Sequence, residues 1–109
     1  MPAPRITILS DYQGQFIRLT LERRLHILEH PEMAALDSAI AQTLADPDSV
    51  IQSSSDPAVR LYHRYYEATP VGGKYLCVVV KVLPDDAFVI TAYLTDSVKK
   101  GPALWPADN

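Results

Sequence analysis

Apolar stretches in the second half of the chain predict a β-hairpin around which the rest is organised. Between Lys74 and Thr95, two runs rich in Val, Ile, Tyr, Phe and Thr flank the polar break Leu83–Asp86, which contains a turn proline. Residues 76–80 are apolar at every position, as in a central strand that is covered on one face and partly on the other. A lone hairpin is marginally stable in water, so this one requires further strands and a helical layer.

The first twenty residues predict a smaller hairpin. The segments Ile6–Leu9 and Gln15–Leu19 can pair around the polar turn Asp11–Gly14, in which the glycine can adopt a positive φ.

Two helices are predicted after this hairpin. Thr20 can cap a first helix that ends near His30, and leucines at helical spacing mark its buried face. Pro31 suits the first position of a second helix over residues 31–45, which Asp46 and Pro47 end. Its apolar residues are spaced by three and four, as an amphipathic helix requires: Met33, Leu36, Ile40 and Leu44.

Further strands are predicted at residues 50–53 and 58–68, separated by a serine-rich turn. The sum predicts an α+β fold over residues 1–109 as a single domain. In this fold two N-terminal helices pack on one face of a four-stranded antiparallel sheet, which the N-terminal β-hairpin can accompany.

Composition excludes several protein classes. With 48% hydrophobic and 21% charged residues the chain is ordinary globular protein, and no apolar run approaches the ~20 residues that span a bilayer. The N-terminus lacks the layout of a signal peptide, so we expect a cytoplasmic protein without membrane partners.

The single cysteine, Cys77, lies among apolar neighbours and predicts a buried, inert thiol. A net charge of −3 argues against a general nucleic-acid coat, although unevenly placed Lys and Arg favour one polyanion-facing side.

The segment His26–His30 matches the inverted zinc motif, in which two histidines four residues apart on a helix share one face. That motif needs a further acidic ligand, and Pro31 ends the helix at the second histidine. The alternative is that His30 caps the helix end and His26 is a surface or partly packed residue.

The predicted strand at residues 58–68 carries a cationic and aromatic stripe. Arg60, Tyr62, Arg64 and Tyr66 alternate and would project from one sheet face, whereas His63 has the opposite parity and is expected to be packed. If Lys81, Thr91 and Tyr93 share that face, the surface could hold a phosphodiester and stack on bases. The alternative is an ordinary solvated sheet face, because strands favour these residue types in any case.

The order of several segments is similar to that of a known fold family. The segments are RLTLERRLHILEHPEM, ADPDSVI, RLYHRYY, KYLCVVVKV and VITAYLT. In this order the chain resembles the phage- and bacteria-associated domains of the barnase–EndoU–colicin–RelE nuclease fold. The resemblance covers about residues 18–101, and the HILEHPE and ITAY segments carry most of it.

This resemblance implies a toxin-like endoribonuclease that cleaves RNA by acid–base chemistry, without a metal or another cofactor. By the same resemblance His26 or His30 would be the acid/base, Arg60 would bind the phosphate, Lys81 would support it, and Thr91 would hydrogen-bond the reacting group. Three further side chains would contact substrate: Tyr62, Arg64 and Tyr93. Two alternatives stay open: a catalytically silent interaction module, which could be a homodimer paired through a sheet edge or the Tyr-rich face, and a zinc-binding protein that uses His26 and His30. A protein inhibitor could be a further partner.

Overall fold

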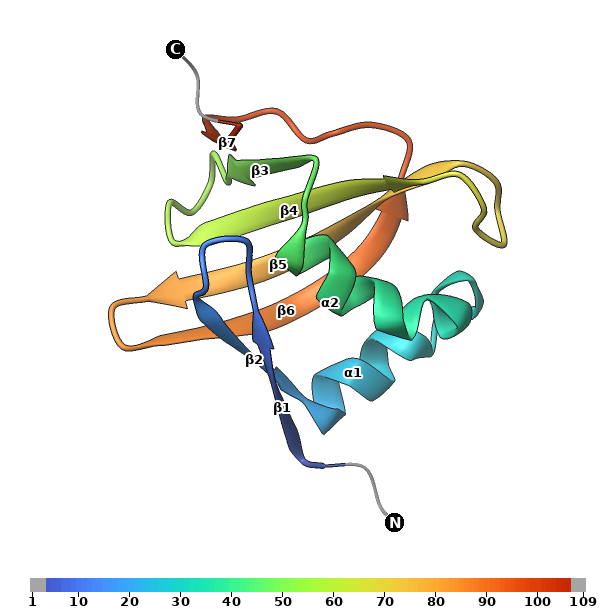
Figure 1. Cartoon of the computed structure of the whole chain (residues 1–109), viewed down its shortest axis with the longest axis horizontal. Coiled ribbons are helices and arrows are strands. Elements are labelled where there is room, and N and C mark those ends of the chain that lie inside the picture. Colours follow the sequence, from blue (N-terminus) through green and yellow to red (C-terminus); the bar gives the residue numbers. More distant parts are fainter. Residues whose placement is uncertain (1–3, 107–109) are drawn as a thin grey trace.

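The computed structural model describes residues 4–106 and shows an α+β fold built on one large sheet. Strands β1 (Ile6–Ser10) and β2 (Phe16–Thr20) form the predicted N-terminal hairpin. Strands β5 (Lys74–Leu83) and β6 (Asp86–Thr95) form the predicted central hairpin, which is the longest in the molecule. Its length and its apolar positions explain why it occupies the middle of the sheet (Figure 1).

The predicted four-stranded antiparallel sheet is wrong, because the sheet formed by residues 4–106 has seven strands and is mixed. The remaining strands are β3 (Ser49–Gln52), β4 (Val59–Tyr66) and β7 (Ala103–Trp105). Their spatial order is β1-β2-β6-β5-β4-β3-β7, and β2 joins β6 in parallel, with Arg18 beside Phe88. The N-terminal hairpin is therefore part of the main sheet, and the helices follow it along the chain.

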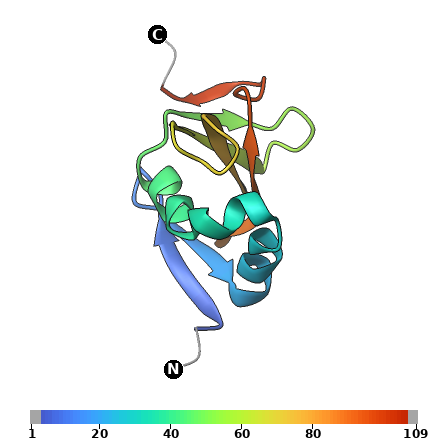
Figure 2. The same cartoon turned by 90° about the vertical axis from the view of Figure 1, so that its right-hand side faces the viewer.

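The helical segments lie between β2 and β3 and cover one face of the sheet (Figures 1 and 2). Helix α1 (Leu21–Leu28) starts as expected, since the Thr20 side chain accepts a hydrogen bond from the Arg23 amide. It ends two residues before His30. The predicted second helix is a 3-10 helix, η1 (Pro31–Leu36), followed by α2 (Asp37–Ala45).

The core fills the space between the helices and the covered face. Ile27 of α1, Ile40 and Leu44 of α2, and Tyr62 and Val78 of the sheet are almost completely buried. Each fully buried aliphatic side chain of this size contributes about 1.5–3 kcal/mol, so this layer supplies most of the stabilisation of the fold. Among residues 4–106, no helix is long and apolar enough to cross a membrane.

Candidate functional site

Strand register decides which side chains share the face of the sheet that the helices do not cover, here called the open face. Across β4, β5 and β6, directly opposite residues form rows on this face. The rows are Val59–Lys81–Phe88, Leu61–Val79–Thr91, His63–Cys77–Tyr93 and Tyr65–Tyr75–Thr95. Arg18 of β2 continues the first row, with its guanidinium 5.4 Å from the centre of the Phe88 ring.

A β-bulge in β6 assembles this face. Val79 pairs with Thr91 and Val80 pairs with Val89, so Ile90 is the additional residue between them. The bulge shifts the alternation by one position and brings Phe88 and Thr91 to the same side. Lys81, Thr91 and Tyr93 thus share one face, as predicted.

The cationic and aromatic stripe of β4 lies on the other face, so the prediction that it joins Lys81, Thr91 and Tyr93 is wrong. Arg60, Tyr62 and Arg64 are paired with Val80, Val78 and Leu76, which belong to the covered face. Alternation on β4 was predicted correctly, but the stripe points at the helices and the core instead of solvent.

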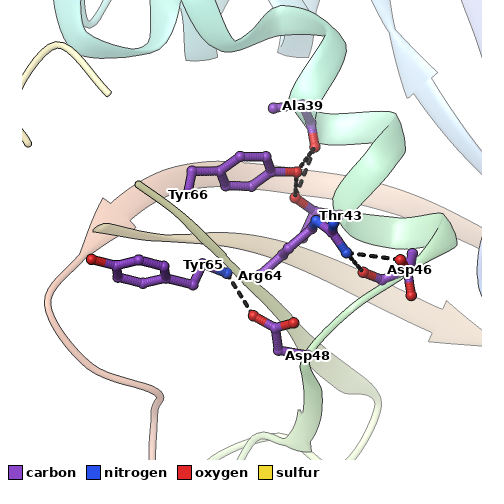
Figure 3. A network of polar contacts seen from close by, with 7 residues as sticks. All are labelled: Ala39, Thr43, Asp46, Asp48, Arg64, Tyr65 and Tyr66. Atoms are coloured by element: carbon purple, nitrogen blue, oxygen red, sulfur yellow. Dashed lines mark hydrogen bonds and ion pairs between the residues drawn. The ribbon is translucent and has the colours of Figure 1, made fainter. Parts of the chain in front are cut away.

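Two residues of the stripe, Arg64 and Tyr66, connect α2 to the sheet through hydrogen bonds (Figure 3). One nitrogen of Arg64, Nη1, donates to the carbonyl oxygen of Asp46 at 2.6 Å and to its carboxylate at 2.9 Å. The Tyr66 hydroxyl lies 3.0 Å from Thr43 Oγ1 and 3.2 Å from the carbonyl oxygen of Ala39. Arg64 therefore has a structural partner at the position where substrate binding was predicted.

Another residue of the stripe, Tyr62, makes a buried polar contact. The hydroxyl of Tyr62, which has no exposed surface, donates to Asp11 Oδ2 at 2.7 Å. Burial and this carboxyl raise the pKa of Tyr62, and the nearby Arg60 guanidinium opposes that shift. Tyr12 packs edge-on against Tyr62. The Arg60 guanidinium lies near both rings, because its charge acts on the pKa of each tyrosine. Arg60 therefore lies beside two tyrosines, whereas the predicted histidines belong to α1 and the segment after it.

Two cations on the open face are neutralised by neighbouring carboxylates. Lys81 Nζ donates to Asp56 at 2.6 Å, and Arg18 forms two hydrogen bonds with Asp86 at 2.9 and 2.7 Å. These contacts hold the pKa values of Asp56 and Asp86 below their usual range, the hydrogen bond from the cation being the largest cause in each. Lys99 differs, because its ammonium lies 5.6 Å from the centre of the Tyr93 ring.

The middle of the open face is closed by the segment after β6. The Lys99 amide donates to His63 Nε2 at 3.2 Å, and both His63 and Cys77 are fully buried. Desolvation lowers the pKa of His63 and raises the pKa of Cys77 to about 11. The predictions of a packed histidine and a buried thiol are confirmed.

Helix α1 carries a separate group of polar side chains. His26, Glu29, Arg23 and Glu22 line one shallow depression, and His26 Nδ1 lies 3.6 Å from Glu29 Oε2. The His26 side chain is 59% exposed, so a substrate can reach it. Arg23 was not singled out from the sequence, although its position three residues before His26 on a helix would place the two on neighbouring surface.

His30 lies outside the helix, with extended backbone at φ −74° and ψ 120°, and is the residue before η1. The two histidines therefore do not share a helical face, which the zinc motif requires. Across residues 4–106, no three His, Cys, Asp or Glu side chains come together as a metal-ligand group.

Comparisons of this chain with protein-family models, curated proteins and solved structures give no significant match. Membership of the barnase–EndoU–colicin–RelE group remains a prediction that rests on the motifs. The geometry divides the predicted site residues into three places: the open face, the covered face and α1.

Proposed function

We propose that this chain is a cytoplasmic, ribonuclease-like domain that cleaves RNA without a metal ion, with His26 as the acid/base. The observation that carries the proposal is the depression on α1, where an exposed imidazole lies beside a carboxylate and a guanidinium. The resemblance of the HILEHPE segment to nuclease-fold domains supports the same residue.

The chemistry assigns each group a role. The unprotonated imidazole of His26 would take the proton of a 2′-hydroxyl while that oxygen bonds to phosphorus. The bond from phosphorus to the 5′ oxygen breaks, and the leaving oxygen takes a proton from water, while the imidazolium of His26 later returns its proton to solvent. Glu29 would hold the Nδ1 side of the ring, leaving Nε2 toward the substrate, and Arg23 would stabilise charge on the phosphoryl oxygens.

The test is cleavage of total RNA by purified protein in EDTA, with His26→Ala, Arg23→Ala and His30→Ala variants. We expect cleavage in the chelator, a loss of about 10²-fold or more in His26→Ala, and a loss in Arg23→Ala. His30→Ala is the matched control, since it also removes an exposed imidazole. That imidazole lies outside α1 and does not line the depression. Equal cleavage by His26→Ala and the unmodified protein would contradict the assignment.

A second candidate function is a catalytically silent interaction module. The pairing of Lys81 with Asp56 and of Arg18 with Asp86 favours it, because an open face whose cations are already neutralised suits a protein surface better than phosphate. Absence of RNA cleavage by the folded protein would favour this function over the first.

A further inference from the structure

Strand β1 forms one edge of the sheet and leaves half of its backbone groups unpaired. Arg5 and Asp11 bond to the β2 side, through the Leu21 amide at 2.8 Å and the Gln15 carbonyl oxygen at 2.9 Å. Because successive residues of a strand point their backbone groups to opposite sides, Thr7 and Leu9 also bond to β2. The amide and carbonyl groups of Ile6, Ile8 and Ser10 therefore point outward, away from the sheet.

This edge lacks the charges, the prolines and the bulges that often prevent strand pairing. Residues 6–10 contain no charge and no proline, and the pairing with β2 has no bulge. Ile6 is 48% exposed and Ile8 is 56% exposed, and Phe16, opposite Ser10 on β2, is 73% exposed. The opposite edge is different, since β7 has only three residues.

We propose that β1 pairs in antiparallel fashion with β1 of a second copy of this chain, about a two-fold axis at Ile8. In this register Ile8 faces Ile8 of the second copy, and Ile6 faces Ser10. All outward donors and acceptors of Ile6, Ile8 and Ser10 are then satisfied. Shifting the pairing by two residues one way would place Ser10 opposite Pro4, which lacks an N–H, and the other way would place Ile6 opposite Tyr12 of the turn.

A second copy is the favoured occupant because the edge is complementary to itself. The strip is uncharged, so two copies meet without repulsion, and a two-fold pairing closes the assembly instead of producing a filament. The pairing also brings Ile6, Ile8 and Phe16 of the two copies onto one continuous apolar surface of the joined sheets. The proposal does not depend on the ribonuclease function, because β1 contains none of its residues.

Sedimentation equilibrium and amide hydrogen exchange on the full chain test this proposal. We expect a dimer in which the amides of Ile6, Ile8 and Ser10 exchange slowly, although residues 4–106 of one copy give them no partner. Ile8→Pro removes one outward donor and no donor to β2, so we expect a monomer in which the amides of Ile6 and Ser10 are unprotected. Ile8→Val keeps the donor and should remain dimeric.

Ile8→Lys provides a second disruption if the proline variant does not fold, because it places two like charges at the axis. A monomeric unmodified protein would overturn the proposal. A dimer that persists in Ile8→Lys, or in which Ile6, Ile8 and Ser10 exchange freely, would overturn it as well.

Discussion

Tyr62 shows at the scale of one residue why the β4 stripe was misjudged from the sequence. Tyrosine and arginine combine a long apolar body with a polar end, so their alternation defines a face without showing whether it is buried. In this fold the apolar ring of Tyr62 enters the core, and its hydroxyl reaches Asp11, whose other oxygen accepts from the Gln13 and Gln15 amides. The polar contact that makes this burial tolerable comes from a turn fifty-one residues away.

Replacing Tyr62 with phenylalanine should therefore lower the free energy of unfolding by about 1–3 kcal/mol, because a buried carboxyl oxygen loses its donor. Tyr65→Phe is the matched control, since Tyr65 is 47% exposed and its substitution should have little effect. Denaturant unfolding monitored by circular dichroism gives both values. Equal stabilities for the two variants would contradict the importance of this contact.

His63 should make the stability of the fold depend on pH. Its folded-state pKa lies below the ordinary 6.5, because burial disfavours the charged ring and Lys99 adds a small repulsion. The unfolded chain therefore binds the proton first, and the free energy of unfolding falls as the pH drops below about 6.5, by at most about 1.4 kcal/mol per pH unit for one proton. Cys77 and Tyr93, its neighbours in the same row, have raised pKa values and stay neutral in this range.

The measurement is denaturant unfolding at a series of pH values for the unmodified protein and for His63→Gln, whose side-chain oxygen can still accept from the Lys99 amide. We expect the variant to lose the dependence between pH 6.5 and the acid range in which Asp56 and Asp86 titrate. An unchanged slope in His63→Gln would show that another group is responsible.

At the scale of elements, hairpins and helix starts were predictable because local rules determine them. The turn at Asp11–Gly14, the cap at Thr20 and the proline-containing break after Leu83 were all recognised from nearby residues. The parallel contact of β2 with β6 joins residues seventy positions apart, Arg18 and Phe88, and no local pattern indicates it. The bulge at Ile90 likewise depends on the partner strand, so the composition of the open face could not be derived from alternation.

The segment between β6 and β7 offers an element-scale prediction at Gly101. This glycine has φ +152°, and a Cβ there would lie 2.5 Å from the carbonyl oxygen of Gln52. Gly101→Ala should therefore destabilise the fold by more than about 1 kcal/mol and loosen the contact of β7 with β3. Thermal unfolding measures the loss of stability. Hydrogen exchange of the Gln52 backbone amide, which donates to the carbonyl oxygen of Pro102, reports the loosened contact.

Gly72→Ala separates the two causes. Gly72 also has a positive φ, of 91°, but a Cβ there has nothing within 4 Å. Gly72→Ala should therefore lower the free energy of unfolding only through backbone strain. A larger loss of stability in Gly101→Ala then reports the clash of the added Cβ with the Gln52 carbonyl oxygen. Equal losses in the two variants would contradict the close approach to Gln52.

At the scale of the whole molecule, the predicted site residues did not converge because the sheet separates them. Arg60 and Arg64 lie on the face that carries the helices, the other face carries Lys81 and Thr91, and His26 is exposed on α1. Sequence order placed these residues in the right elements, but the choice of face depends on long-range packing. The local group on α1 combines an imidazole, a carboxylate and a guanidinium.

We propose that this chain cleaves RNA through attack by the 2′-hydroxyl, with His26 as the acid/base. The most direct test of this proposal is the chemistry of the cut ends, measured by phosphorus NMR on a short RNA incubated with the protein in EDTA. The account predicts 2′,3′-cyclic phosphate ends, formed by the unmodified protein and absent with His26→Ala, and no cleavage where the 2′-hydroxyl is replaced by hydrogen. Uncut RNA, cleavage of the deoxy substrate, or ends carrying a 5′-phosphate would contradict it.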